Sequence, residues 1–517
     1  MIVEDQSEVI AFLSQPGTYG PGVRSVERRE THASVLFLAG ARVFKLKRAV
    51  RFPYLDYGSA AARQHFCTAE VAINRRTAGG IYRGVVAVVR RPDGRLGLGG
   101  KGQPVDWLVE MQRFAEDALL DRMAAAGQLD RRLIESLADV IAGFHRQAEP
   151  RPDAGGAAAM AAILDGNIRS FAEADPAVLD RDAIARLAAA SRQALERLAP
   201  LLDRRRAEGF VRHCHGDLHL RNIVLLEGRP VLFDAIEFDA AFADIDVLYD
   251  LAFLVMDLEF RDLGRLANIL LNRYLDVTGD SSGLAALPLF CSLRAAIRSH
   301  IDAAAAATHS DAEAAAALAA GAARYLALAL AFLETAAPRL IAVGGLSGSG
   351  KSRLARELAP AFAPRSGARI IRTDATRKRL AGVAPETRLA AADYSAEATR
   401  RTYAAIGDEA RDALTAGRTV IADAVFARPQ ERAAIAAVAA AAGVPFHGLW
   451  LEADPAVLER RVRERSGDIS DATPEVVRRQ AALDPGGIDW HRLSASGTAE
   501  DTLRAATGLL GAEPHSP

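Results

Sequence analysis

Cysteine is scarce in this sequence, with three residues among 517, at positions 67, 214 and 291. Their wide separation excludes a disulfide framework and any metal-ligand spacing of the zinc-site kind. Lys and Arg (64) balance Asp and Glu (65), which leaves no basic field for nucleic acid and no polybasic tail for a membrane surface. The first residues, MIVEDQ, lack the basic-then-apolar order of a signal peptide. These absences predict a cytoplasmic protein with no nucleic-acid or membrane partner.

Long apolar runs free of polar residues are also lacking. The two most apolar stretches, near 315–337 and 433–451, are interrupted by Arg324 and Glu334 and by Pro445 and His447. We therefore expect packed helix or strand there, and no membrane span. No Gly/Ser-rich linker precedes the last third of the chain, so we expect its two halves to pack against each other.

Residues 345–352, GLSGSGKS, match the phosphate-binding pattern G-x-x-x-x-G-K-S. The glycines allow the backbone to close around an anion and turn its N–H groups inward. Lys351 can reach the β- and γ-phosphates, and Ser352 can place a hydroxyl on Mg²⁺. A strand-type run at 340–343 and a helix-type run at 352–358 flank the loop, so a helix N-terminus faces the phosphates. The candidate nucleotide-binding residues are Gly345, Ser347, Gly348, Ser349, Gly350, Lys351 and Ser352.

The rest of the last third predicts strands that alternate with helices, and hence a parallel sheet with active residues at the strand C-termini. The expected strands lie at 368–374, 419–423, 444–451 and 490–493, with a closing helix near 498–510. Asp423, at a strand end, is the candidate ligand of an Mg²⁺-bound water. Asp374 is a candidate substrate-binding or proton-accepting carboxylate.

A run of arginines at 460–465 precedes a Gly/Ser/Asp turn. Some of these side chains belong to a solvated helix face, but one or two arginines on a lid can neutralise phosphoryl charge during transfer. We select Arg461 and Arg465 because an i, i+4 pair shares one helix face.

The first third predicts a small sheet and one helix. The expected elements are strands at 34–38, 42–47, 84–90 and 105–111, with a hairpin turn at 39–41 and a helix at 58–77. This order is that of a protein-kinase N-lobe, although no G-x-G-x-x-G loop precedes the second strand.

In such a lobe a strand lysine holds the α/β-phosphates and a helix glutamate fixes the lysine. Glu70 is the candidate glutamate, and Lys45 and Lys47 share one strand face because side chains alternate with period two. We prefer Lys45, because the residue two positions before it, Val43, suits contact with a nucleotide base.

The middle of the chain contains the kernel His215-x-Asp217-x-x-x-x-Asn222. Kinase catalytic loops use this spacing because the aspartate accepts the substrate hydroxyl proton and the asparagine ligates Mg²⁺. An apolar strand at 231–234 follows and ends in a carboxylate, where the second metal ligand belongs. Asp234 and Glu237 are both within reach, and the choice between them stays open.

The stretch from His215 to Asn222, the following FDAIEF and the later DVLYDLA resemble the aminoglycoside phosphotransferase-like, protein-kinase-like family over roughly residues 25–335. Phe144-His145 also fits that pattern. The resemblance implies Asp217 as base, Asn222 and Asp234 as Mg²⁺ ligands, and a Lys45–Glu70 pair. It also implies a hinge that binds nucleotide near Glu110 and Met111. The sequence departs from it in having Asp-Ala-Ile-Glu in place of a D-F-G-like ending.

Residues 338–511 resemble small P-loop kinases, including gluconate kinase, polynucleotide kinase, chloramphenicol phosphotransferase and zeta-toxin-like enzymes. The two resemblances imply an α+β two-lobed protein-kinase-like domain followed by an α/β parallel-sheet P-loop NTPase domain. The expected boundaries are 1–335, with an N-lobe at about 25–110 and a C-lobe at about 111–335, and 336–517.

The function expected is that of a bifunctional kinase that uses ATP and Mg²⁺ to phosphorylate small hydroxylated molecules. Alternatives are one active kinase with the other domain a nucleotide-binding regulatory module, an ATP-sensing stress protein, and a toxin that phosphorylates a nucleotide-sugar. The sequence leaves open the acceptor of either half, ATP against GTP, and the oligomeric state.

Overall fold

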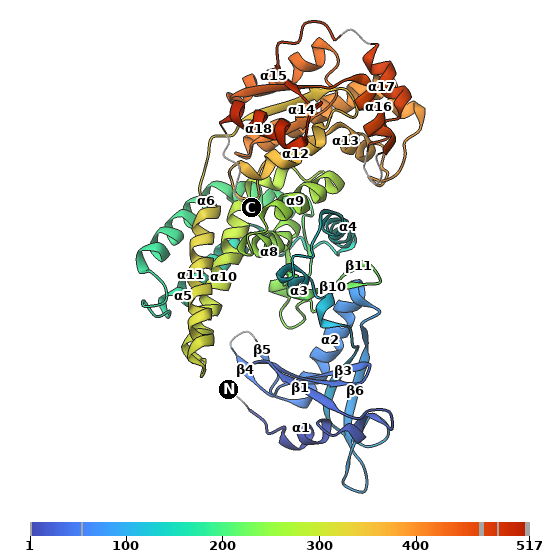
Figure 1. Cartoon of the computed structure of the whole chain (residues 1–517). Coiled ribbons are helices and arrows are strands. Elements are labelled where there is room, and N and C mark those ends of the chain that lie inside the picture. The colour runs from blue at the N-terminus through green and yellow to red at the C-terminus, as the bar shows by residue number, and fades with distance from the viewer. Residues whose placement is uncertain (1–2, 53–54, 465–469, 483–484, 512–517) are drawn as a thin grey trace. The chain divides into compact units, whose positions relative to one another are not determined.

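The structure of the chain is a computed structural model that describes residues 3–52, 55–464, 470–482 and 485–511. It divides into two compact units (Figure 1). The first unit contains Met1–Gly156 and Arg205–Leu254, and the second contains Ala157–Arg204 and Val255–Pro517. The predicted boundary at 335/336 does not coincide with this division and stays a prediction.

An antiparallel sheet of order β1-β2-β3-β8-β6-β7 forms the N-terminal part of the first unit. Its strands are β1 (Val26–Glu30), β2 (Ser34–Ala39), β3 (Arg42–Lys47), β6 (Tyr82–Arg90), β7 (Leu96–Leu98) and β8 (Gln103–Gln112). The predicted hairpin is confirmed, because β2 and β3 pair with Leu36 opposite Lys45. Alternate residues of β2 and β3 are buried with the short helix α1 (Ser7–Leu13), which gives this part its own apolar core.

Helix α2 (Ala60–Ala78) confirms the helix predicted at 58–77 and packs against β6 and β8 (Figure 1). It begins at Ser59, whose hydroxyl accepts a hydrogen bond from the backbone N–H of Ala62. Glu70 and Asn74 lie on its buried face although both are polar. Buried polar groups need partners, and this face of α2 is where the first candidate site is built.

The rest of the first unit carries three short ladders in its described residues, β4-β5, β10-β11 and β12-β9. The elements are β4 (Arg51–Phe52), β5 (Leu55–Asp56), α3 (Leu120–Ala125), α4 (Arg131–Gln147), β9 (Val211–His213), β10 (Ile223–Leu226), β11 (Arg229–Leu232), α7 (Ala240–Ala243), β12 (Asp244–Asp246) and the start of α8 (Val247–Phe260). The prediction that a strand runs to Asp234 is wrong. The strand ends at Leu232, and Asp234 adopts φ 60°, a conformation that cannot continue a ladder.

The second unit contains a parallel sheet of order β14-β15-β13-β16-β17, as predicted. Its strands are β13 (Leu340–Gly345), β14 (Arg369–Arg372), β15 (Val420–Asp423), β16 (Phe446–Glu452) and β17 (His491–Ser494). Its helices are α12 (Lys351–Leu358), α13 (Thr373–Leu380), α14 (Ala396–Thr415), α15 (Pro429–Ala442), α16 (Pro455–Glu464), α17 (Pro474–Ala481) and α18 (Ala499–Leu510). Side chains of α12 and α18 form one core with the sheet.

The second unit also contains α5 (Gly156–Ala172), most of α6 (Arg181–Ala207), α9 (Gly264–Thr278), α10 (Leu287–Thr308) and α11 (Ala312–Phe332). The alanine-rich run 303–337, whose leucine spacing predicts one helix, is divided between α10 and α11. Asp311 caps the start of α11 by accepting from the N–H groups of Glu313 and Ala314. Among the described helices, α11 has the length and composition of a membrane span. It packs against α10, whose Ser299 hydroxyl donates to the carbonyl of Ala322 at 2.8 Å.

Helix α9 covers β14, which is an edge strand of the parallel sheet. The Asn272 amide accepts from the N–H of Ile370 at 2.7 Å and donates to the carbonyl of Ala368 at 3.1 Å. Asn268 donates to the same carbonyl at 3.0 Å, and Asp276 pairs with Arg369 at 2.7 Å. Unpaired edge groups need such cover. A helix from before residue 335 therefore completes the sheet that contains the phosphate-binding motif.

Candidate functional sites

The first site centres on Lys45 of β3, whose ammonium lies 2.8 Å from Glu70 Oε1 and 2.8 Å from Asp234 Oδ1. Burial alone would lower the pKa of Lys45, but the carboxylates of Asp234 and Glu70 raise it well above its usual value. Burial likewise opposes ionisation of Glu70, yet the nearby lysines lower its pKa to about 2. Lys45 and Glu70 are therefore both charged at neutral pH, and the structure brings together the lysine and glutamate predicted from the sequence.

The two carboxylates left open by the sequence differ in exposure. The Asp234 side chain is 43% exposed, whereas that of Glu237 is 8% exposed and is paired with Lys47. Tyr57 donates to Glu237 as well, at 2.7 Å. Glu237 thus has its charge and hydrogen bonds satisfied inside the protein, and Asp234 has an accessible oxygen.

The loop between β9 and β10 holds Asp217 and Asn222. The Asn222 amide donates to the carboxylate of Asp217 at 2.8 Å and to its carbonyl oxygen at 3.0 Å. His219 Nε2 lies 3.3 Å from the same carboxylate. Oxygen ligands of this kind suit Mg²⁺, and both of these hydrogen bonds use the amide nitrogen of Asn222 and not its oxygen, so the residue types fit the predicted role.

Buried groups support this loop. Asp250 of α8 accepts from the N–H groups of His215 and Gly216 at 3.1 and 2.9 Å, and His145 of α4 lies 3.1 Å from the same carboxylate. Burial lowers the pKa of His215, so its neutral ring donates through Nε2 to the carbonyl of Phe233 at 2.9 Å. Gly216 has φ 84°, and a Cβ there would meet the carbonyl of Phe242 at 2.7 Å. The loop conformation thus depends on residues far away in the sequence.

The hinge residues implied by resemblance lie at the end of β8. Met111 is opposite Val43 of β3 in the ladder, and Glu110 pairs with Arg42 at 3.3 Å. This register places Val43, which is expected to contact a nucleotide base, beside the predicted hinge residue Met111. Their nucleotide-binding role stays a prediction.

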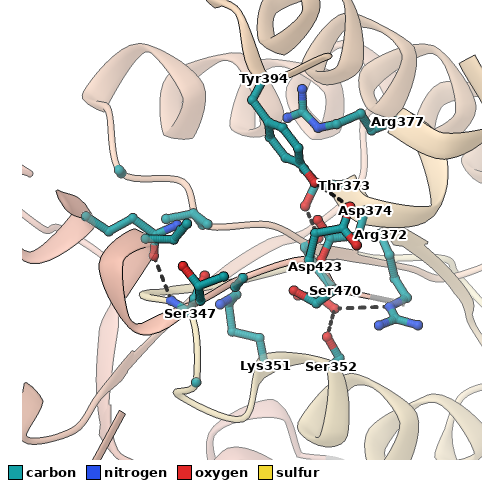
Figure 2. A pocket seen from close by; sticks show the side chains of 18 of the residues that line it. Ser347, Lys351, Ser352, Arg372, Thr373, Asp374, Arg377, Tyr394, Asp423 and Ser470 are labelled. Atoms are coloured by element: carbon teal, nitrogen blue, oxygen red, sulfur yellow. Dashed lines mark hydrogen bonds and ion pairs between the residues drawn. The ribbon is translucent and has the colours of Figure 1, made fainter. Parts of the chain in front are cut away.

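The second site is a cavity of about 1120 Å³ at the carboxyl ends of the parallel strands (Figure 2). Lys351 donates to the carbonyl of Leu346 at 2.9 Å, and the hydroxyl of Ser352 donates to Asp423 at 2.5 Å. Gly348 has φ 86°, and a Cβ there would meet the carbonyl of Leu458 at 2.7 Å. The buried hydroxyl of Ser349 has no hydrogen-bond partner among the described residues. The loop therefore has the glycine geometry and a spare polar group that suit a phosphate.

Asp374 also lines the cavity, but not at a strand end as expected. Strand β14 ends at Arg372, and Asp374 lies in the first turn of α13, where a carboxylate meets the positive end of the helix. Burial raises the pKa of Asp374, and a hydrogen bond with Ser470 and the charge of Arg372 offset this only in part. A carboxylate with a raised pKa in a cavity is suited to accept a proton.

Arg461 lines the cavity from α16 and donates to the carbonyls of Ala495 and Gly497 at 2.8 and 3.4 Å. Its guanidinium thereby joins α16 to the segment that follows β17. The other selected arginine, Arg465, lies outside the described residues.

Several residues of the cavity were not predicted from the sequence. Asp471 accepts from the hydroxyl of Tyr394 at 2.8 Å and from the N–H of Leu389 at 3.0 Å. Gln480 of α17 accepts from the N–H of Ser347 at 2.8 Å. Spacing carries no signal for contacts between residues 77 to 133 positions apart. Arg372 could have been predicted from the sequence, because it stands two residues before the candidate Asp374. In the structure its guanidinium lies 3.6 Å from Asp423.

Residues 68–290 match the phosphotransferase enzyme family, and residues 340–483 match the AAA domain family. An uncharacterized protein of Mycobacterium tuberculosis is 30% identical over 491 residues, which are 93% of this chain and 94% of the relative, and a Mycobacterium bovis protein matches equally.

Solved structures show lower similarity. A gluconokinase from Sinorhizobium meliloti 1021 is 23% identical over 34% of this chain and 93% of its own, with TM-score 0.25. A choline/ethanolamine kinase family protein from Mesorhizobium loti is 14% identical over 60% and 93%, with TM-score 0.36. A thermostable mutant of an aminoglycoside phosphotransferase is 14% identical over 62% and 98%, with TM-score 0.38.

Proposed function

Because residues 68–290 belong to the phosphotransferase enzyme family and residues 340–483 to the AAA domain family, in a protein-kinase-like domain followed by a P-loop NTPase domain, we propose that this chain is a bifunctional ATP-dependent phosphotransferase. Its acceptors are small molecules with hydroxyl groups, and the protein acts in the cytoplasm. One observation supports the proposal: each half contains a lysine, side-chain oxygen groups of the kind that ligate Mg²⁺, and a carboxylate close to one of these groups.

In the first half, Asp217 accepts the proton of the acceptor hydroxyl as its oxygen bonds to the γ-phosphorus, the bond from that phosphorus to the β,γ-bridging oxygen breaks, and ADP leaves. Asn222 orients Asp217 through the 2.8 Å hydrogen bond. Lys45 holds the α/β-phosphates, and Glu70 fixes Lys45. Asn222 and Asp234 are the proposed ligands of Mg²⁺, which when bound would neutralise phosphate charge.

In the second half, the loop 345–352 binds the phosphates through its backbone N–H groups and Lys351. Ser352 and Asp423 are the proposed holders of Mg²⁺, Ser352 directly and Asp423 through water. Asp374 takes the acceptor proton, and Arg461 neutralises phosphoryl charge during transfer; the same role for Arg465 stays a prediction. The names of similar proteins, among them gluconokinase and choline/ethanolamine kinase, indicate acceptors to test first.

A second candidate is that only the first half transfers phosphate and the P-loop half regulates it. Gln480 favours this candidate, because its side chain takes the Ser347 N–H that a phosphate oxygen would take. In this alternative, nucleotide binding would displace Gln480 without a chemical step.

The experiment is ATP turnover by purified protein with a panel of sugars, sugar acids, choline, aminoglycosides and nucleosides. Wild type is measured beside Asp217→Asn and Lys351→Ala. The bifunctional proposal expects two acceptor classes, each lost in one variant and kept in the other. If every acceptor-dependent turnover survives Lys351→Ala, the regulatory candidate replaces it. If no acceptor stimulates turnover in wild type, both fail.

A further inference from the structure

A second lysine occupies the interior of the first site. Lys47 of β3 is fully buried, and its ammonium lies 2.6 Å from Glu70 Oε2 and 3.3 Å from the Tyr57 hydroxyl. It also pairs with Glu237. A lysine is rarely buried without a reason, because taking its charge out of water must be offset by specific partners.

The two lysines divide the carboxylate of Glu70 between them. Lys45 contacts Oε1 and Lys47 contacts Oε2, at 2.8 and 2.6 Å. The Lys45 side chain is 15% exposed and that of Lys47 is 1% exposed. Lys45 is therefore the lysine that a nucleotide can reach, and Lys47 is the one that cannot leave Glu70 when ligand binds.

Lys45 has a second demand on its charge. In the proposed function Lys45 binds phosphates. The more its ammonium interacts with the phosphates, the weaker its electrostatic interaction with Glu70 becomes. A buried carboxylate left with too little compensation is costly. Lys47 supplies that compensation from the side away from the ligand, so Glu70 can stay ionised and in place while Lys45 serves the phosphates.

The same lysine settles the position of Glu237. Glu237 accepts from Tyr57 and pairs with Lys47, and its side chain is 8% exposed. Asp234 contacts Lys45 but is 43% exposed. With Glu237 held inside, Asp234 is the carboxylate left to meet a metal.

We propose that Lys47 is a positioning residue of the first nucleotide site, acting through Glu70 on Lys45 and keeping Glu237 away from the metal. This inference rests on the proposed function of the first half. It predicts that removing Lys47 weakens binding of Mg·ATP although Lys47 does not touch the nucleotide.

The test measures binding of a non-hydrolysable ATP analogue with Mg²⁺ to full-length protein by calorimetry, in a Lys351→Ala background that disables the P-loop site. Unfolding temperature is measured on the same samples. Lys47→Met, Lys47→Arg, Lys45→Met and the double variant Lys47→Met/Glu237→Gln are compared. The double variant matters because it removes the carboxylate that Lys47→Met alone leaves buried and unpaired.

The expected result is that Lys47→Met loses both stability and about tenfold or more in affinity, in the range found when supporting residues of a site are removed. Lys47→Arg keeps the charge and recovers most of both. The double variant recovers the unfolding temperature but not the affinity, because Glu70 still has one lysine. A merely structural role would instead restore both together in the double variant, and that outcome overturns the proposal.

Lys45→Met distinguishes a failure of the proposed nucleotide site from a failure of the positioning role of Lys47. If Lys45→Met loses affinity and the double variant binds like the background protein, the positioning role of Lys47 is wrong and the first nucleotide site stands. If Lys45→Met also binds like the background protein, the first site does not bind nucleotide as proposed, and the role of Lys47 is overturned with it.

Discussion

Lys45 in the first unit and Lys351 in the second are both predicted to meet phosphates, but they are held by different kinds of neighbour. Lys45 contacts the carboxylates of Glu70 and Asp234, which lie 25 and 189 residues away. Lys351 donates to a backbone carbonyl five residues away. Lys45 is held by charged side chains from distant segments, whereas Lys351 directly follows a short loop that its own glycines help to shape. Loss of a lysine should therefore cost the two sites different things.

The largest effect is expected from removing each lysine in turn. Lys45→Met leaves Glu70 with Lys47 as its one lysine partner and removes the ion pair of Asp234 with Lys45. The variant should therefore lose nucleotide binding and up to about 3–5 kcal/mol of folding stability. Lys351→Met should lower phosphate transfer by the second half by about 100-fold or more, with little change in stability. Urea denaturation and acceptor-dependent turnover measure both. Equal stability losses would contradict the comparison.

The next largest effect is expected from substituting the proposed metal ligand of the first site. Asp234→Asn should lower turnover by the first half by about 100-fold and raise the Mg²⁺ concentration needed, because an exposed anionic oxygen is lost. Glu237→Gln, the matched control, keeps the hydrogen-bonding shape of a group already satisfied by Lys47 and Tyr57. Turnover is measured as a function of Mg²⁺ concentration. The Mg²⁺ concentration for half-maximal turnover should rise in Asp234→Asn and stay unchanged in Glu237→Gln. The reverse pattern would assign the metal to Glu237.

The acid sensitivity of the first site follows from Glu70. Lys45 and Lys47 outweigh burial and lower the pKa of Glu70 from 4.5 to about 2. Its ionised form thus stabilises the folded state above pH 4.5, and that stabilisation is lost as pH falls from 4.5 to about 2. Glu70→Gln should be less stable than wild type at neutral pH, and its unfolding free energy should fall less over this range.

Circular dichroism in urea at several pH values measures this effect. Glu334→Gln, a substitution at an exposed position outside the site, should keep the pH dependence of wild type. An unchanged pH dependence in Glu70→Gln would mean that the acid response comes from other groups.

The local character of the P-loop site can be tested at the far edge of its sheet. Asn272→Ala leaves the N–H of Ile370 and the carbonyl of Ala368 without this partner, and should cost about 1–3 kcal/mol of stability. The affinity of the loop for nucleotide should stay the same, because these two hydrogen bonds of Asn272 are made to β14 and its flank, not to the loop. Gln128→Ala, at an exposed amide, is the control. A large loss of affinity would show that the loop depends on α9.

The smallest effect is expected at the wall of the cavity. Tyr394→Phe removes the hydrogen bond to Asp471, worth about 0.5–1.5 kcal/mol, and should raise the KM for the acceptor a few-fold with kcat nearly unchanged. Steady-state kinetics of the second half measure it. A fall in kcat of more than about tenfold would place Tyr394 in the chemistry itself.

The sequence was a good guide where structure is local. The strand, loop and helix around residues 345–352 were predicted in order, as were the hairpin of β2 and β3 and helix α2. Errors fell where a polar side chain ends an element early. Asp311 caps a new helix in a run of alanines, and α13 begins at Thr373, so that Asp374 lies in its first turn where a strand was expected to continue.

The first site could be predicted as a list of residues but not as an arrangement. Alternation along β3 placed Lys45 and Lys47 on one face, yet nothing in their spacing says which is accessible or which carboxylate each one meets. Those answers depend on Asp234 and Glu237, 189 and 190 residues further on. Tyr57, which helps to hold Glu237, gave no signal in the sequence.

By itself the sequence determined that a phosphate-binding loop joins a strand to a helix, because glycine, lysine and serine at fixed spacing shape that loop within eight residues. It also determined which residue types a kinase-like catalytic loop would present. Only the tertiary structure decided that Glu237 is buried against Lys47 while Asp234 stays exposed, and that α9 completes the edge of the parallel sheet. Burial and charge pairing between distant segments are properties of packing, and packing is not written in the spacing of neighbours along the chain.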